Sequence, residues 1–429
     1  MSSGPPIDAR RVLADLRELE RRTGGPDGAR RVCWDPAWRI ARDFLRELLD
    51  ELALTTEIDE AGNLWATLPG VDRHAPALAL GSHLDSVPAG GWLDGALGVM
   101  AAVGVLRAWV TSGSTPPRSL VLLDFADEEG ARFGRSLFGS SALAGTLVSD
   151  EVAVLRDQAG FTAAEILEGN GVVVAGAPSA AERRGRLGAF IELHIEQGPV
   201  LEREGLPVAA VAGCVGVERH RCTFCGQAAH AGTTPMRTRR DAGLAAADAA
   251  LRIEQVGLSR GGVTTTGRWE FSPGVPTAVP GKVELTMDLR HADEDQLAAM
   301  LAEAKEAAAQ TAALRQCELR WEEIWRIEPI PFDVTLVRAA ADASRRAGGS
   351  DQTLTSGALH DAAELARVMP AAMLFTSSRG GISHSKDEDT PESHLVAAIA
   401  AFGDLAADAV QRLADGEVEW QPNRRSECR

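Results

Sequence analysis

Continuous apolar runs that alternate with helical segments constrain this chain more than any other feature of its sequence. Three such runs are PALALGSH at 76–83, RSLVLLDFA at 118–126 and GAFIELHI at 188–195. Strands that are apolar on both faces are typical of a mostly parallel sheet covered by helices. Polar residues lie at or just past the end of each run, where open α/β sheets bind ligands. The runs therefore predict an α/β fold with one shared site at an edge of the sheet.

The pattern of the sequence changes at about residue 213. VGVERHRCTFCG, GVTTTGRWEF and KVELTMDLRH alternate apolar and polar residues, as strands do when one face of a sheet meets water. Helical patterns lie between them, and the α/β pattern resumes near residue 330. We therefore expect an inserted α+β domain at 213–328 and a first domain made of 1–212 and 329–429. The helices are expected at about 7–22, 37–53, 94–110, 240–256 and 293–313.

Charge and composition narrow the classes of partner. The net charge of −17 argues against nucleic acid, because phosphate binding requires a basic face. No uninterrupted apolar stretch reaches about 18 residues, so no membrane span is predicted, and the first residues lack the apolar core of a secretory signal. Cys222 and Cys225 form a C-x-x-C without a second pair at zinc-site spacing. Ordinary thiols in the reducing cytoplasm are therefore expected.

Five side chains of the kinds that bind metal ions each lie in a short motif that contains glycine. They are His83 in GSHLDSVP, Asp94 in GGWLDGALG, Glu129 in DFADEEGARFG, His194 in IELHIEQGP and His384 in GGISHSKDE. These groups could hold two divalent ions if one carboxylate bridged them, and Asp94 is the expected bridge. Each motif alone also allows a plain interpretation. Asp94 could cap a helix that begins at 96, and His194 could be a hydrogen-bonded core residue.

The neighbours of these residues suggest further roles. Asp85 lies two residues after His83, on the same side of an extended segment, where it could accept the second ring N–H of that histidine. Glu128 precedes Glu129, and neighbouring side chains point to different sides, so Glu128 would be free to act as general base and acid. An exposed acidic turn is the alternative. Gln197 offers an amide for a polar substrate.

Two residues of the expected insert could act on a substrate. His230 in GQAAHAGTTPM could donate a hydrogen bond to an oxyanion, although a solvated loop histidine is the alternative. Arg290 ends VELTMDLR and could bind a carboxylate with two hydrogen bonds, with a surface salt bridge as the alternative. The sequence contains no tyrosine, so no phenol could act as acid, base or oxyanion donor.

Together, GSHLDSVPAGGWLDGALGV, DEEGARFG, ELHIEQGPVLE, HAGTTPMRTRRDA and GGISHS resemble the amidase/carbamoylase branch of the M20 metallopeptidase superfamily, over about residues 7–412. That branch includes N-carbamoyl-L-amino-acid hydrolases, β-ureidopropionases and allantoate amidohydrolases. The resemblance implies a zinc-peptidase-like catalytic domain and a ferredoxin-like lid that also forms a homodimer. It implies one ion on His83, Asp94 and His194, and a second on Asp94, Glu129 and His384. Zn²⁺ is the first expectation, and Mn²⁺, Co²⁺ or Ni²⁺ would fit the same ligands.

The resemblance also implies roles in the reaction. Glu128 would be the general base, and His230 would stabilise the oxyanion, reaching the site of the partner subunit. Gln197 and Arg290 would hold the polar groups of the substrate, with Arg290 on a carboxylate.

Two positions depart from the family pattern. Thr277 stands where the family often has asparagine, and Val217 stands where it often has glutamine, so contacts to the substrate would differ. His360 is a further candidate for substrate binding. The expected function is hydrolysis of the carbamoyl group of an N-carbamoyl amino acid or related ureido acid, with release of ammonia and carbon dioxide. The alternatives are an aminopeptidase or deacylase, an allantoate amidohydrolase, and a metal-loaded dimeric binding protein without turnover.

Overall fold

The structure is a computed structural model that describes residues 4–420. Its chain divides into two compact units. The first contains the described residues up to Ala212 and from Pro331 onward, and the second is Gly213–Ile330.

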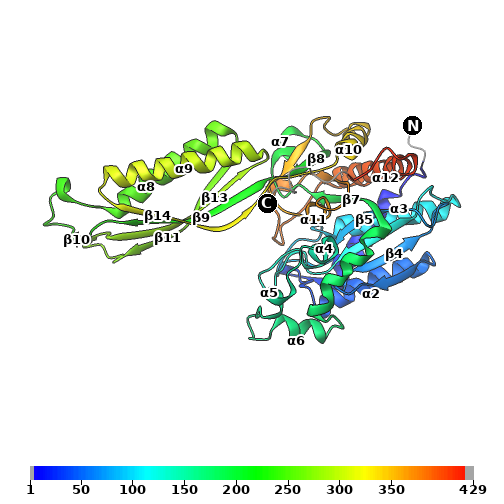
Figure 1. The fold of residues 1–429 in the computed structure, drawn as a ribbon. Coiled ribbons are helices and arrows are strands. Elements are labelled where there is room, and N and C mark those ends of the chain that lie inside the picture. The colour runs from blue at the N-terminus through cyan, green and yellow to red at the C-terminus, as the bar shows by residue number, and fades with distance from the viewer. Residues whose placement is uncertain (1–3, 421–429) are drawn as a thin grey trace. The chain divides into compact units, whose positions relative to one another are not determined.

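A mixed sheet forms the centre of the first unit (Figure 1). Its four central strands are parallel: β17 pairs with β7, β7 with β5, and β5 with β6. The flanking pairs β17–β8, β4–β6 and β3–β4 are antiparallel. The order across the sheet is β15 (Ile330–Pro331), β8 (Val208–Cys214), β17 (Ala371–Thr376), β7 (Leu187–Ile195), β5 (Ala77–His83), β6 (Leu120–Phe125), β4 (Leu64–Leu68) and β3 (Thr55–Ile58), and β16 (Leu354–Ser356) also pairs with β8. The three predicted apolar strands are β5, β6 and β7, and the predicted α/β fold is confirmed.

Helices cover this sheet. α3 packs on β5, β6 and β7, while α12 packs on β5, β7 and β17, and α1 contacts both helices. Asp8 caps α1 by accepting a hydrogen bond from the amide of Arg11, and Pro36 begins α2, where a missing N–H costs nothing. The helices of this unit are α1 (Ala9–Thr23), α2 (Pro36–Glu51), α3 (Ala96–Ser112), α4 (Phe138–Ala144), α5 (Ser149–Ala153), α6 (Ala163–Glu168), α7 (Val200–Glu204), α10 (Val334–Arg346), α11 (Asp361–Leu365) and α12 (Glu392–Asp415), with 3-10 turns at Val174–Arg186 and Arg379–Gly381. A small hairpin joins β1 (Gly24–Gly25) and β2 (Gly28–Ala29).

Strand alternation decides which side chains of β7 face the main core. Ala189, Ile191 and Leu193 belong to the large apolar cluster of this unit. Successive side chains of a strand point to opposite faces, so Glu192 and His194 point to the other face. That face carries polar residues although it is buried.

The last helix, α12, is long and apolar enough to cross a membrane by length and composition. However, 56% of its most apolar window is buried inside the structure. Leu395, Ile399 and Phe402 lie in the main core. Its apolar face is therefore accounted for by packing, as in the core helix of a globular protein.

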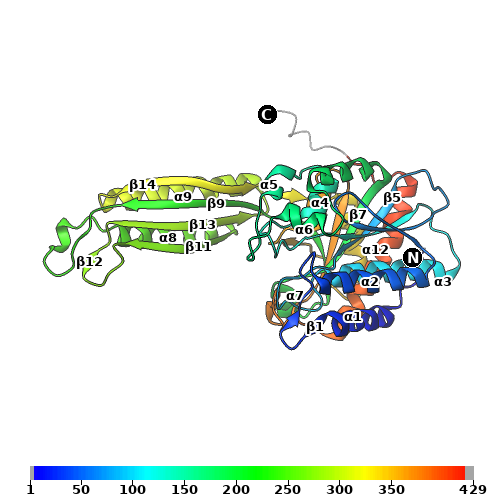
Figure 2. The ribbon, with the colours of Figure 1, turned by 90° about the horizontal axis from the view of Figure 1, so that it is seen from below.

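The second unit is a four-stranded antiparallel sheet with two helices on one face (Figure 1). Figure 2 shows the strands side by side in the order β14, β9, β13 and β11. The chain order is β9 (Gly216–Cys225), α8 (Ala242–Arg260), β11 (Val263–Ser272), β13 (Lys282–His291), α9 (Glu294–Leu314) and β14 (Glu318–Ile327), and a short pair joins β10 (Ala229–His230) to β12 (Ala278–Val279). This βαββαβ connection is the ferredoxin-like topology.

The core of the second unit lies between its sheet and its helices. Cys222 and Phe224 of β9 pack there with Leu285 of β13 and the alanine-rich faces of α8 and α9. Burial raises the pKa of Cys222 to about 12. Cys222 and Cys225 are both free thiols. The C-x-x-C is therefore part of a strand with one core-facing thiol, and its first thiol is inert.

Candidate functional site

The predicted metal-type residues of the first unit come together at the carboxyl ends of the parallel strands. His83 ends β5, His194 is the second-last residue of β7, and Glu129 follows β6. Asp94 lies just before α3, and His384 lies in the loop after β17. Two sets of ligand atoms result, each with all atoms within 4.8 Å of one another: His83, Asp94 and His194 in one, and Asp94, Glu129 and His384 in the other. Asp94 is common to both.

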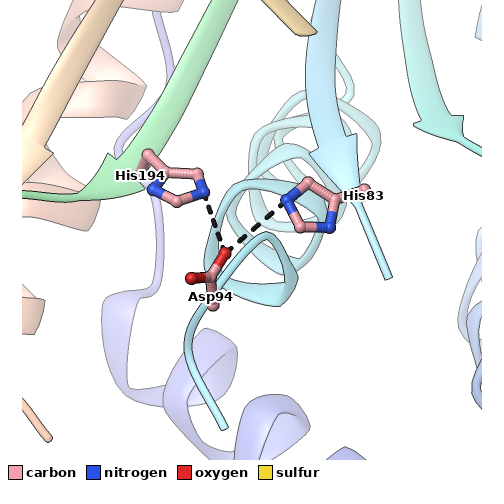
Figure 3. A group of neighbouring side chains, drawn as sticks. All are labelled: His83, Asp94 and His194. Atoms are coloured by element: carbon pink, nitrogen blue, oxygen red, sulfur yellow. Dashed lines mark ion pairs between the residues drawn. The ribbon is translucent and has the colours of Figure 1, made fainter. Parts of the chain in front are cut away.

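The first set is closed off from solvent. His194 Nε2 lies 3.2 Å and His83 Nε2 lies 3.6 Å from Asp94 Oδ1, and both rings are about 1% exposed. Figure 3 shows both imidazoles pointing at this one oxygen. The Nδ1 atoms of the two rings bond to main-chain carbonyls, of Asp85 at 3.1 Å and of Ile195 at 3.0 Å. Carbonyls only accept, so each Nδ1 carries a proton, and in the neutral ring Nε2 can offer its lone pair.

The second set is more open. His384 Nε2 lies 3.5 Å from Asp94 Oδ2 and 3.4 Å from Glu129 Oε2, and the His384 side chain is 50% exposed. The Gln197 amide donates to Asp94 Oδ2 over 2.8 Å and lies 3.4 Å from His384. Gln197 and His384 both have positive φ angles, 58° and 55°, which non-glycine residues seldom adopt. Their loops are thus bent sharply toward Asp94.

Several buried polar atoms of these ligand residues have no hydrogen-bond partner among the described residues. They include His83 Nε2, His194 Nε2 and Glu129 Oε1. Buried polar groups are normally paired, and buried charges are paired or bound to metal ions. These three atoms belong to residues of the two ligand sets, and the donor set of imidazoles and carboxylates suits divalent ions. The residues present therefore fit a pair of divalent metal ions.

The pKa values of the residues in and beside the ligand sets indicate that this region lacks positive charge. Burial, and then the charge of Asp94, raises the pKa of Glu129 to about 9. Burial and the neighbouring carboxylates, Asp361 and Glu129 first, raise the pKa of Glu128 well above its ordinary value. Burial alone would lower the pKa of His194, but the charge of Asp94 outweighs it and raises that pKa to about 9. In each case a proton supplies charge that a cation could supply instead.

Glu128 is buried, which excludes the alternative of an exposed acidic turn. Its Oε2 lies 3.6 Å from His83 Nε2. Asp94 is likewise not the cap of α3, because Gly95 is the cap residue and no side chain caps this helix. A side chain at Gly95, with φ of 65°, would place its Cβ 2.3 Å from the His83 ring. Glycine there lets the Asp94 loop approach the imidazole.

Asp85 lies where the sequence places it but makes different contacts. The ring of His83 bonds to the main-chain carbonyl of Asp85, and the carboxylate is 3.6 Å away. That carboxylate instead accepts the amides of Glu128 at 3.3 Å and Glu129 at 3.1 Å. Asp85 therefore holds the chain that carries both glutamates.

His360 lies beside the first ligand set. Its ring is 4.5 Å from that of His194, it is 2% exposed, and its Nε2 bonds to the Ser356 hydroxyl at 3.0 Å. With Glu192 and His194 it forms a third group of possible metal ligands. Burial, followed by His194, lowers the pKa of His360 well below its ordinary value, so it is neutral.

The remaining predicted residues belong to the second unit. His230 is exposed on β10, and its Nδ1 accepts the amides of Gly232 and Thr233. Thr277 is exposed, and its carbonyl accepts the amide of Ala231. Arg290 pairs with Asp288, with 2.6 Å from its Nε to Oδ1.

Sequence reasoning missed several buried or partly buried residues around the ligand sets. Glu388 and Ser383 contact the Asp94 loop, and Arg31 is completely buried with its Nε donating to the carbonyl of Leu84. Glu388 lies in the predicted His384 motif, and only that proximity could have drawn attention to it.

Comparison with known proteins shows the family of this chain. The family model of peptidase family M20/M25/M40 matches residues 79–408, and the chain belongs to this family. The chain is 36% identical to an N-carbamoyl-L-amino acid amidohydrolase of Geobacillus stearothermophilus, covering 94% of this chain and 98% of that one. It is 32% identical to an allantoate amidohydrolase of Bacillus subtilis, covering 88% and 92%. A solved amidase of the hydantoinase/carbamoylase family from Burkholderia multivorans has a TM-score of 0.87 and 32% identity, covering 94% and 98%. The predicted resemblance to the amidase/carbamoylase branch is confirmed.

Proposed function

We propose that this chain hydrolyses the carbamoyl group of an N-carbamoyl amino acid or of a related ureido acid. The observation that carries the proposal is the position of Asp94, whose two oxygens face separate sets of ligand atoms. Glu128 lies beside the first set, 3.6 Å from His83. The family and the amidohydrolase relatives support the same reaction class.

In this proposal His83, Asp94 and His194 would hold one divalent ion, and Asp94, Glu129 and His384 would hold the other. Zn²⁺ is the first candidate, and Mn²⁺, Co²⁺ or Ni²⁺ would fit the same nitrogen and oxygen ligands. When bound, such a pair of ions polarises a carbonyl and makes water nucleophilic near neutral pH.

The Glu128 side chain would transfer the protons of the reaction. Glu128 takes a proton from the attacking water and later gives it to the leaving nitrogen. One water and the carbamoyl compound yield the free amino acid and carbamic acid, which decomposes to ammonia and carbon dioxide. Burial favours the protonated form of Glu128, which suits the second of these two steps.

Other residues would bind and orient the substrate. The His230 Nδ1 accepts two amides, so the neutral ring carries its proton on Nε2, ready to donate to an oxyanion. Gln197 would hold a polar group beside Asp94, and Arg290 would bind the carboxylate. Thr277 and His360 are further substrate-binding candidates. Val217 lies directly opposite Arg290 on the neighbouring strand, so an apolar side chain stands beside the proposed carboxylate site.

We also propose a homodimer formed through the second unit, and a cytoplasmic location. β11 and β14 are the two edge strands of that sheet, and both expose apolar residues, including Val263, Phe271 and Trp325. Such edges are suited to pair with another chain.

Allantoate amidohydrolase activity is the second candidate, supported by the Bacillus subtilis relative. An M20-type aminopeptidase or deacylase is a third possibility within the family. A substrate panel separates them. Protein with measured metal content is given N-carbamoyl-L-amino acids, allantoate, dipeptides and N-acyl amino acids, and release of ammonia and of the free amino acid is measured. We expect ammonia from carbamoyl compounds. Cleavage of dipeptides alone would refute the proposal, and no turnover of any substrate would favour a silent binding protein.

A further inference from the structure

Glu388 connects two loops that are distant in sequence. It is 2% exposed and lies four residues after His384. Its Oε1 accepts the amides of Leu93 at 3.1 Å and of Asp94 at 3.0 Å. Its carboxylate thus fixes the main chain of the one residue that both ligand sets share.

Ser383 provides a second connection, to the side chain of Asp94. Its hydroxyl lies 2.9 Å from Asp94 Oδ2 and 3.2 Å from Glu388 Oε2. A serine hydroxyl has one proton, so it donates to one of these carboxylates at a time. Glu388 can therefore set the orientation of this hydroxyl, and through it the rotation of the Asp94 carboxylate.

The residues around Glu388 accommodate its buried carboxylate. A Cβ on Gly91 would lie 2.0 Å from Glu388 Oε1, so only glycine allows the close approach. Arg31 is 0% exposed, and among the described residues its two terminal nitrogens have no hydrogen-bond partner. Burial lowers the pKa of Arg31, and the negative charge of Glu388 is the strongest opposing influence. The burial of Glu388 is thus balanced by two amide donors, by the hydroxyl that it shares with Asp94, and by the charge of Arg31.

We propose that Glu388, acting with Ser383, is a positioning residue that holds Asp94 so that one carboxylate oxygen faces each of the two ligand sets. The inference rests on the proposed function, because it assigns Asp94 to two cations. Loss of His384 would remove a ligand of one set only, whereas loss of Glu388 would disturb the residue common to both.

Metal binding tests this directly. Metal-free protein is titrated with Co²⁺, and binding is followed by calorimetry and by the visible spectrum of the bound ion. In Glu388→Ala we expect both sites to bind about 10–100-fold more weakly, as for the loss of other partners that hold metal ligands, together with a changed spectrum. Glu388→Gln keeps an oxygen for the two amides and should recover most of the affinity. Asp387→Asn, at the exposed neighbouring carboxylate, is the matched control and should behave as the wild type.

Wild-type affinity and spectrum in Glu388→Ala would overturn the inference. If that variant does not fold, Ser383→Ala decides, because it removes the hydroxyl between the two carboxylates. We expect weaker binding and a changed spectrum there, and unchanged binding would overturn the inference. A wild-type protein that binds no Co²⁺ and cleaves no carbamoyl compound would instead refute the proposed function. A wild type that does both, beside an unaffected Glu388→Ala, would refute the positioning role alone.

Discussion

Glu128 Oε2 lies 3.6 Å from His83 Nε2, a distance too long for a hydrogen bond. The Glu128 carboxylate therefore lies near the first ligand set and makes no hydrogen bond to His83. Glu129, the neighbouring residue, lies beside His384 of the second set. The two glutamates therefore take different places, Glu128 as the proposed base and Glu129 as a proposed ligand.

Glu128→Gln should keep both metal ions and lose turnover. The substitution preserves shape and removes only the ability to carry a proton, so we expect kcat to fall at least about 10²–10⁴-fold. Metal content by mass spectrometry and ammonia release on the same sample would check this. Glu151→Gln, at an exposed glutamate, is the control. Retained activity in Glu128→Gln would remove Glu128 as the base.

The metal-free protein should lose stability as pH rises from about 6.5 to about 9. Folding raises the pKa of Glu129 from 4.5 to about 9 and that of His194 from 6.5 to about 9. The folded chain thus binds these protons more tightly. For each group, the contribution of its proton to the free energy of unfolding is complete below the pKa of the unfolded chain. This contribution is lost as the pH passes the folded-state pKa of about 9.

Thermal unfolding of chelator-treated protein between about pH 6.5 and about pH 9 checks the direction of this change in stability. Divalent ions replace these protons, so added Zn²⁺ should raise the midpoint more at pH 9 than at pH 6.5. A metal-free midpoint that rises with pH would contradict this account.

His230→Ala should leave the metal content unchanged and slow the reaction. Loss of one oxyanion donor lowers kcat about 10²–10³-fold, and we expect a loss of that size in steady-state assays. His230→Gln retains an N–H donor and should recover part of the rate. His74→Ala, at an exposed histidine, serves as the control. An unchanged kcat would make His230 an ordinary loop residue.

Arg290→Ala should raise KM for substrates that carry a carboxylate by about 10–100-fold. This factor corresponds to the free energy of a hydrogen bond to a charged group. The same substrates with the carboxylate converted to an amide should show little difference between variant and wild type. Arg219 also pairs with Asp288, so Arg219→Ala tests whether disturbing Asp288 is sufficient. An equal effect on both kinds of substrate would argue for a structural ion pair.

Local pattern explains which strands could be predicted. KVELTMDLRH coincides with β13, whose residues alternate in burial, and the continuous apolar runs became β5, β6 and β7. The sequence layout implies a strand after the second helix of this unit, but no residues could be assigned to β14 (Glu318–Ile327). Its register shifts between Glu323 and Trp325, and its residues are largely exposed. An irregular edge strand with little burial has no clear period of two.

The sequence by itself determined the types of group available, the strands that carry them and the family. It could do so because apolar periodicity and short motifs are local properties of a chain. Only the tertiary structure decided the partners of individual atoms. His83 bonds to the carbonyl of Asp85 rather than to its carboxylate, and Glu388 holds amides about 294 residues earlier in the chain. Such pairings depend on how distant backbone segments approach to within a hydrogen-bond length, which no local pattern encodes.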